Sequence, residues 1–272
     1  MSFIRVENVW KEYGDQIVLE DISFVIERRA FLMLVGPSGC GKTTFLRMLL
    51  GEEGPTRGKI LMDGKPLIAE PDADRGVVFQ RYSVFPHLTA LRNVMFGAEL
   101  AEAPFLGKLF GARRRAVEDK ARALLAEVGL SGAEDKYPAA LSGGMQQRLA
   151  LAQALMRQPK ILLLDEPFGA LDPGIRADIQ ALMQRLWNET DLTVVMVTHD
   201  LPEAFRLGTR ILAFERSRNR PEERERYGAT IAKDIEIWPP RIAGATQPFN
   251  RPGRDDPAIP GANPGRPGLQ AS

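Results

Sequence analysis

Residues 36–44, GPSGCGKTT, have the types and spacing that could hold a phosphate group. They fit the pattern G-x-x-x-x-G-K-[ST], in which glycines let backbone N–H groups approach an anion without clashes from Cβ atoms. In this pattern Lys42 reaches the β- and γ-phosphates of a nucleotide, and the Thr43 hydroxyl binds Mg²⁺. The alternative is an ordinary glycine-rich turn. The residues that we expect to line the anion are Gly36, Pro37, Ser38, Gly39, Cys40, Gly41, Lys42, Thr43 and Thr44.

Two acidic residues end a short apolar run in the stretch ILLLDEP, residues 161–167. A buried strand here would deliver Asp165 and Glu166 to its carboxyl end, where ligands bind in open α/β sheets. We expect Asp165 to belong to the Mg²⁺ shell and Glu166 to orient and deprotonate an attacking water. Taken alone, the pair could be no more than acidic residues at the end of a strand.

A second glycine-rich helix start lies at residues 141–148, LSGGMQQR. Ser142, Gly143 and Gly144 precede helical spacing, which again suits an anion. Because one γ-phosphate cannot easily use two such starts from one monomer, the pattern favours a head-to-tail dimer. The second start of one chain would then close over the nucleotide of the other. Taken alone, the stretch would be a glycine-softened N-cap.

The elements that must position these residues alternate between strands and helices. Residues 31–36, FLMLVG, form a continuous apolar run, which is typical of a strand buried on both faces. Helical spacing follows over residues 43–50 and stops at Gly51. Strand-like runs return at 160–165, 192–198 and 210–214, with a helix between the first two. This β–α–β order predicts a parallel sheet with right-handed crossovers.

Two further regions complete the predicted α/β fold, which has a mostly parallel core sheet. The segments FIRVENVW and LEDISFVIE alternate partly, and residues 57–67 indicate a hairpin that turns at Asp63 and Gly64, so we expect an N-terminal antiparallel β-subdomain. Strand patterns are absent over residues 82–158, where helical spacing is clear at 113–128 and 142–157. We therefore expect a helical insertion subdomain there.

Composition excludes several functional classes. The formal net charge is +1, which lacks the basic excess of nucleic-acid binders, so no nucleic-acid partner is expected. Cys40 is the single cysteine, so no intrachain disulfide can form, which fits a reducing compartment. No basic segment followed by an apolar one marks a signal peptide, and no apolar run approaches the roughly 20 residues of a membrane helix. Work at a membrane would require a partner that spans it.

These motifs occur in the order found in the ATP-binding cassette (ABC) transporter ATPases, and the chain resembles that family over about residues 2–214. The resemblance implies a P-loop NTPase that binds ATP and Mg²⁺ and hydrolyses ATP. It also implies that Tyr13 stacks on adenine and that Gln80 touches Mg²⁺ and the attacking water. Ser142, Gly143 and Gly144 match the signature that contacts ATP held by the opposite cassette. Asp172 matches a dimer-contact aspartate, and His199 a switch histidine at the γ-phosphate.

Each of these residues also has a simpler interpretation. Tyr13 alone could be a surface aromatic at a turn, and Gln80 an ordinary polar residue at a strand end. Asp172 could be a helix N-cap, and a lone histidine such as His199 is usually structural. His87 has no placement that points to chemistry, and we expect it at the surface or facing a partner.

The resemblance implies a domain plan and partners. Residues 1–214 would form the ATPase domain, with its helical subdomain at about 82–158. Residues 215–240 would form a charged extension, and 241–272 a Pro- and Gly-rich tail too poor in apolar residues to order. The expected partners are a second copy or a homologous cassette, membrane permease subunits, and indirectly a solute-binding protein. The expected location is the cytoplasmic face of the inner membrane, as a peripheral subunit.

Within the family, the chain is similar to importers of the nitrate, sulfonate and taurine group, including members associated with urea or amide metabolism. Residues 82–97 are the expected docking surface for the permease, although they could equally be core of the helical subdomain. Three alternatives stay open: an exporter-type ATPase, a non-transport ATPase of DNA repair or translation, and an ATP-binding regulator without hydrolysis. The last is disfavoured by Glu166, which supplies the base that such a protein could lack.

Overall fold

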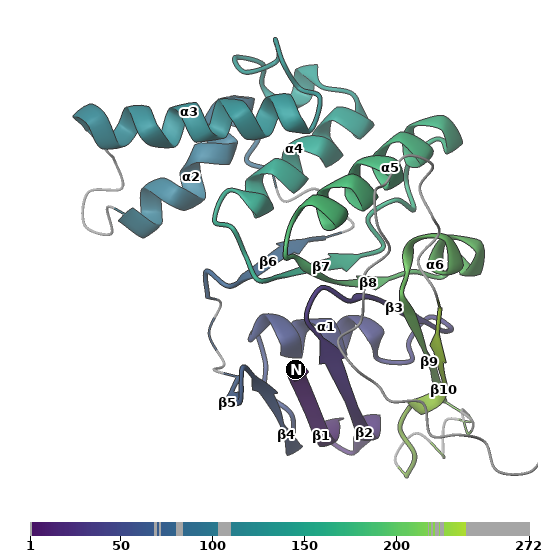
Figure 1. The fold of residues 1–272 in the computed structure, drawn as a ribbon. Coiled ribbons are helices and arrows are strands. Elements are labelled where there is room, and N and C mark those ends of the chain that lie inside the picture. The colour runs from purple at the N-terminus through teal and green to yellow at the C-terminus, as the bar shows by residue number, and fades with distance from the viewer. Residues whose placement is uncertain are drawn as a thin grey trace, which may run out of the picture. The chain divides into compact units, whose positions relative to one another are not determined.

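The computed structural model describes residues 2–67, 70, 72–79, 84–102, 110–216, 218, 220, 223 and 226–237. The chain divides into two units, Met1–Pro239 and Pro240–Ser272. The second unit and the predicted disordered tail at 241–272 lie outside the described residues, as does Gln80. Figure 1 shows the elements of the first unit.

A four-stranded antiparallel sheet forms the predicted N-terminal β-subdomain. Its order is β2-β1-β4-β5, with β1 at Ser2–Tyr13, β2 at Gln16–Glu27, β4 at Arg57–Met62 and β5 at Lys65–Pro66. The predicted hairpin turns at Asp63 and Gly64, whose φ angles are 51° and 76°. Positive φ at both central positions matches the right-handed twist of the flanking strands, which is why Asp-Gly is favoured there.

A six-stranded sheet forms the centre of the unit, in the order β10-β9-β3-β8-β7-β6. Its strands are β3 (Phe31–Val35), β6 (Arg75–Val78), β7 (Ile161–Asp165), β8 (Thr193–Val197), β9 (Arg210–Glu215) and β10 (Thr230–Glu236). The first five pair in parallel, and only β10 runs antiparallel to its neighbour. The predicted fold class, a P-loop α/β fold with a mostly parallel sheet, is confirmed.

Helices cover both faces of the central sheet. They are α1 (Lys42–Leu50), α2 (Ala90–Glu102), α3 (Gly111–Glu127), α4 (Gly143–Leu155), α5 (Pro173–Glu189) and α6 (Leu201–Leu207), with a 3₁₀ turn at Pro138–Ala140. Alternate residues of β3 enter two cores: Leu32 and Leu34 pack with α1 and the antiparallel sheet, whereas Met33 faces the other helices. Burial on both faces explains why the core strands are continuously apolar.

The predicted helical insertion is present in its described part, residues 84–102 and 110–158. Helices α2, α3 and α4 pack together there, apart from the antiparallel sheet (Figure 1). No helix in the described ranges is both long and apolar enough to span a bilayer.

Strand β10 extends the sheet beyond residue 214, where the sequence places the end of the ATPase domain. The charge-rich composition does not indicate this strand. Its charged residues pair with the neighbouring strand, and few apolar residues are present to give the alternation of a half-buried strand. Arg210 donates to both oxygens of Asp234 at 2.7 and 2.6 Å. The compact unit continues to Pro239, so part of the predicted charged extension at 215–240 belongs to the central sheet.

Candidate nucleotide-binding site

The phosphate loop connects β3 to α1, and two of its glycines have no substitute. Gly36 and Gly41 have φ angles of 144° and 87°, which side chains rarely adopt. A Cβ at Gly36 would lie 2.1 Å from the Phe214 carbonyl oxygen, and one at Gly41 would lie 2.6 Å from Cδ2 of Leu19. The loop is therefore packed so closely against its surroundings that only glycine fits.

The Lys42 ammonium lies inside this loop. Its Nζ donates to the carbonyl oxygens of Gly36 at 2.8 Å and Pro37 at 2.9 Å, and it lies 3.6 Å from the buried Cys40 Sγ. The N-cap of α1 is Gly41, which offers no side chain to the first backbone N–H groups of the helix. Those N–H groups and the ammonium together form a positive cradle suited to a phosphate.

The predicted magnesium ligands meet at the base of the loop. The Thr43 hydroxyl at the start of α1 donates to Asp165 Oδ1, at the end of β7, over 3.3 Å. Burial raises the pKa of the Asp165 carboxyl, the Thr43 hydrogen bond lowers it, and the neighbouring Glu166 charge raises it further. A cation placed here would oppose that rise, since a nearby positive charge favours the carboxylate.

The donor set at this position fits Mg²⁺. A hydroxyl and one carboxylate are hard oxygen ligands, and Mg²⁺ is usually held by one or two carboxylates together with substrate phosphates and water. No group of three or more His, Cys, Asp or Glu residues that could hold a metal occurs in the described part of the chain.

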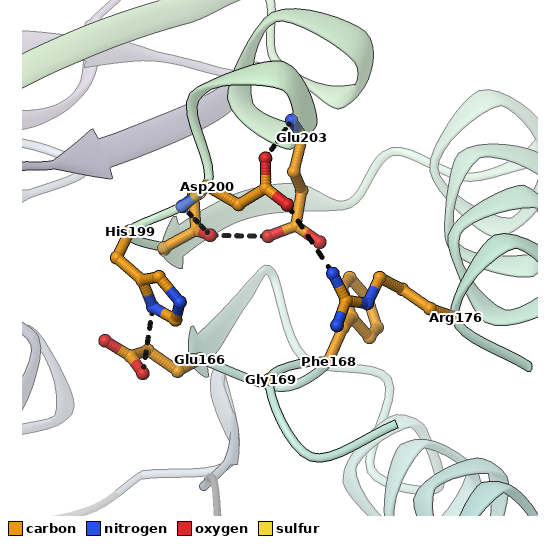
Figure 2. A pocket seen from close by; sticks show the side chains of 8 residues that line it. Glu166, Phe168, Gly169, Arg176, His199, Asp200 and Glu203 are labelled. Atoms are coloured by element: carbon orange, nitrogen blue, oxygen red, sulfur yellow. Dashed lines mark hydrogen bonds and ion pairs between the residues drawn. The ribbon is translucent and has the colours of Figure 1, made fainter. Parts of the chain in front are cut away.

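Glu166 and His199 face each other beside this position. His199 Nδ1 lies 3.3 Å from Glu166 Oε2, and Figure 2 shows the two side chains directed toward one another. Glu166 has a φ of 46°, which is unusual for a residue with a long side chain, and its amide donates to the Val197 carbonyl at 3.0 Å. Strained backbone of this kind gathers at active sites, where it fixes the direction of a side chain.

Tyr13 lies at the end of β1 and is held by residues next to α1. Its hydroxyl donates to Glu53, and the Lys11 ammonium lies 4.9 Å from the ring centroid. Burial, followed by the hydrogen bond to Glu53, raises the pKa of Tyr13 to about 12. Because the side chain is still 47% exposed, the ring has surface left for a planar ligand.

The signature helix α4 begins at Ser142, whose Oγ accepts from the Met145 amide at 3.4 Å. Ser142 and Gly143 are exposed, whereas Gly144 is buried. A Cβ at Gly144 would lie 2.4 Å from Cγ2 of Ile175, so glycine is needed for α4 and α5 to approach each other. Ser142 is therefore accessible at the surface, and the close contact between α4 and α5 fixes the position of this helix start.

The other predicted residues are placed as follows. Asp172 occupies the N-cap position of α5, but its side chain accepts no capping hydrogen bond and is exposed. His87 is exposed, in line with its predicted surface position. The sequence did not indicate a role for Arg176, Gln180 or Glu203. Figure 2 shows Arg176 and Glu203 near Asp200, and Arg176 pairs with that carboxylate. Gln180 donates a hydrogen bond to Glu203. One signal was available, because Asp200-x-x-Glu203 has the spacing of a capping box.

The fold and this site define an α/β P-loop NTPase. The family described as ABC transporter matches residues 19–169, which is more than half of the 272 residues. The chain belongs to that family. Its predicted recognition as an ABC transporter ATP-binding subunit is thereby confirmed at the level of the family.

The relatives include two proteins named as importers. An uncharacterized ABC transporter ATP-binding protein of Methanocaldococcus jannaschii is 43% identical over 77% of this chain and 76% of its own length. Spermidine/putrescine import ATP-binding protein PotA of Rubrobacter xylanophilus is 42% identical over 79% of this chain. Sulfate/thiosulfate import ATP-binding protein CysA of Mycobacterium bovis is 41% identical over the same share. The match spans 55% of the length of that PotA and 59% of that CysA.

A similar solved structure is a dimeric ATP-binding cassette in a post-hydrolysis state, bound to ADP and Pi. It is 30% identical, covers 86% of this chain and 98% of that chain, and has a TM-score of 0.67. The likeness extends over the central sheet and the helical subdomain together, because so much of both chains is covered.

Proposed function

We propose that this chain is the ATP-hydrolysing subunit of an ABC import transporter. The observation that carries the proposal is the convergence of two pairs at one sheet edge: Thr43 with Asp165 at 3.3 Å, and Glu166 with His199 at 3.3 Å. The first pair has the chemistry of a magnesium site beside a phosphate loop. The second places a carboxylate base beside a group that can donate to a phosphate.

The residues divide the catalytic work among themselves. Lys42 binds the β- and γ-phosphates, the loop amides cradle them, and Thr43 and Asp165 hold Mg²⁺ with Gln80. When bound, Mg²⁺ neutralises charge on the phosphates. Glu166 orients the attacking water and takes its proton, and His199 contacts the γ-phosphate. Tyr13 stacks on the adenine.

Two chains act as a head-to-tail dimer in this proposal. Ser142, Gly143 and Gly144 of one cassette close over the nucleotide held by the other, and Asp172 contacts the facing subunit. The exposure of Ser142 and Gly143 supports this arrangement, because a signature helix that binds in trans must be accessible. The dimeric form of the similar cassette bound to ADP and Pi supports it too.

Site-directed cross-linking tests this geometry. In a Cys40→Ser background, one population carries Ser38→Cys in the exposed phosphate loop and another carries Ser142→Cys in the exposed signature. We expect ATP to promote a disulfide only when the two populations are mixed, each with Glu166→Gln to prevent turnover. Cross-linking that ignores ATP, or that occurs within either population alone, would argue against the composite site.

Residues 82–97 remain the proposed docking surface for a separate permease. In the described part of this segment, the buried Asn93 holds residues 85–89: its Oδ1 accepts from the Phe85 amide at 2.7 Å, and its Nδ2 donates to the carbonyls of Phe85, Leu88 and Thr89. Pro86 and His87 are left exposed at the tip. A rigid, exposed tip is suited to receive a partner and to pass on a movement from Gln80.

The solute is proposed as a small molecule of the nitrate, sulfonate, taurine or urea class. The similar proteins named as importers support the direction of transport, whereas their different named solutes favour no single one. Reconstitution with the permease in proteoliposomes tests both points. With the cassette on the outer face, that face is the cytoplasmic side, so we expect ATP-dependent release of one of these solutes from loaded vesicles. ATP-dependent uptake into the lumen in this orientation would contradict the import assignment.

A further inference from the structure

A single guanidinium joins the loop that carries Asp172 to the segment that carries His199. Arg176 NH1 lies 3.5 Å from Asp200 Oδ2, and Arg176 NH2 donates to the Leu171 carbonyl at 3.4 Å. Leu171 directly precedes Asp172, and Asp200 directly follows His199. The Arg176 side chain therefore touches the neighbours of both residues, as Figure 2 shows for its approach to Asp200, and the Arg176 amide donates to the Asp172 carbonyl at 2.8 Å.

A buried carboxylate secures the same segment from the other side. Glu203, only 5% exposed, accepts from the Thr198 hydroxyl at 2.5 Å and from Gln180 Nε2 at 2.7 Å. Gln180 Oε1 accepts in turn from Arg206 at 2.9 Å. Because Arg176 and Gln180 are four residues apart on α5, both arms of this network begin on the same helix face.

The network brackets His199 without contacting its ring. Thr198, on one side, is tied to Glu203, and Asp200, on the other, is tied to Arg176. Thr198 and Asp200 are also linked to each other, because the Asp200 amide donates to the Thr198 hydroxyl at 3.0 Å. Asp200 Oδ1 in addition accepts from the Glu203 amide at 3.0 Å. The His199 side chain itself is 66% exposed and turned toward Glu166. The position of the imidazole therefore depends on the main chain of residues 198–200, which side chains of α5 hold in place.

From this geometry we infer that Arg176 is a positioning residue that couples the Asp172 loop to His199, with Glu203 anchoring the same segment. A facing cassette that presses on Asp172 shifts the start of α5, and Arg176 carries that shift to Asp200 and so to the imidazole. The inference rests on the proposed ATPase function. It assigns a role to four residues, Arg176, Gln180, Asp200 and Glu203, that contact no expected ligand.

The first test compares two arginines of α5. Arg185 also donates to a main-chain carbonyl, that of Glu127 at 2.8 Å, but it lies outside the network. We expect Arg176→Ala to lower kcat for ATP by about tenfold or more, since small misplacements of a catalytic group are costly, and to leave KM within about twofold. Arg185→Ala should leave both constants unchanged. If Arg176 only stabilised the fold, Arg176→Ala would lower the melting temperature as Arg185→Ala does. It would not lower kcat while leaving KM unchanged.

The second test asks whether Arg176 acts through Asp200. Asp200→Asn keeps an acceptor for the Glu203 amide, so the start of α6 stays capped while the charge is lost. We expect the Arg176→Ala/Asp200→Asn double variant to lose no more activity than Arg176→Ala alone, because both substitutions break the same contact. Additive losses would overturn the coupling. Arg176→Lys serves if the alanine variant fails to fold, and its kcat should fall while its melting temperature stays near that of the wild type.

The outcomes separate this inference from the proposed function. A wild-type chain that hydrolyses ATP, with an Arg176→Ala variant that matches Arg185→Ala in kcat, would overturn the inference and leave the ATPase assignment standing. A wild-type chain without ATPase activity would overturn the proposed function itself.

Discussion

His199 Nδ1 lies 3.3 Å from Glu166 Oε2, although the two residues follow different strands of the central sheet. Glu166 follows β7 and His199 follows β8, and these strands pair in parallel with Asp165 opposite Val197. The Glu166 amide donates to the Val197 carbonyl, which continues the strand pairing into the site. Main-chain pairing therefore sets the distance between the carboxylate and the imidazole.

Tyr13→Ala should weaken ATP binding, because stacking of a base on an aromatic ring contributes about 1–3 kcal/mol. Tyr13→Phe should retain most of the affinity, since it keeps the ring and loses only the hydroxyl with its hydrogen bonds to Glu53 and Thr44. Isothermal titration with ATP measures both variants. Tyr137→Ala, at a similarly exposed tyrosine, is the control. Equal affinities for Tyr13→Ala and Tyr137→Ala would place the adenine elsewhere.

Lys42→Ala should lower ATP affinity by roughly tenfold or more, since hydrogen bonds to charged groups contribute about 1.5–3 kcal/mol. The ammonium at the centre of the loop is the group expected to move onto the phosphates. Lys59→Ala, on β4 and paired with Glu7 at 3.0 Å, is a matched control that should bind ATP normally. An Lys42→Ala protein with wild-type affinity would show that this lysine is not a phosphate ligand.

Gly144→Ala should destabilise the fold by about 1–3 kcal/mol, the usual cost of overpacking a core. The added methyl would meet Ile175, and Ile175→Ala in the same chain should restore part of the loss. Chemical denaturation measures the free energies of unfolding. Gly174→Ala is the control, because a Cβ there meets open space. Failure of the second substitution to rescue the first would rule out the Ile175 contact as the cause.

Glu203 should make stability depend on pH in a particular direction. Burial raises the pKa of its carboxyl, and hydrogen bonds from Thr198 and Gln180 offset part of that rise. A raised pKa means that the ionised form is less favourable in the folded state than in the unfolded state. The wild type should therefore lose stability relative to Glu203→Gln as the pH rises through the folded-state pKa.

Melting temperatures of the two proteins at about pH 4 and about pH 8 test this. The advantage of Glu203→Gln over the wild type should be larger at the higher pH. Glu118→Gln provides a control of opposite sign, because the hydrogen bond from Arg122 lowers the pKa of that carboxyl. A difference between wild type and Glu203→Gln that stays constant with pH would contradict the prediction.

Much of the site could be predicted because its groups lie in short, contiguous motifs. The phosphate loop needs only the local order strand, glycine-rich turn and helix, and Asp165 needs only the end of a buried strand. The contact between Thr43 and Asp165 then follows, because α1 starts beside the edge at which β7 ends. The head-to-tail dimer and Gln80 stay predictions.

Other features could not be predicted because they depend on pairings between distant segments. Strand β10 is stabilised by Arg210 and Asp234 across the ladder, and its own composition resembles an exposed, charged segment. Arg176 and Glu203 likewise show no motif of a catalytic kind. Their positions follow from the packing of α5 against α6, which is a property of the assembled fold.

The most direct measurement of the central claim is the behaviour of Glu166→Gln with ATP. Steady-state hydrolysis and molar mass by light scattering are recorded on the same samples, with Glu189→Gln on α5 as a control. The account predicts that Glu166→Gln loses hydrolysis and becomes dimeric when ATP is added, while the control hydrolyses normally. A Glu166→Gln protein that turns over ATP at the wild-type rate, or that stays monomeric in saturating ATP, would contradict it.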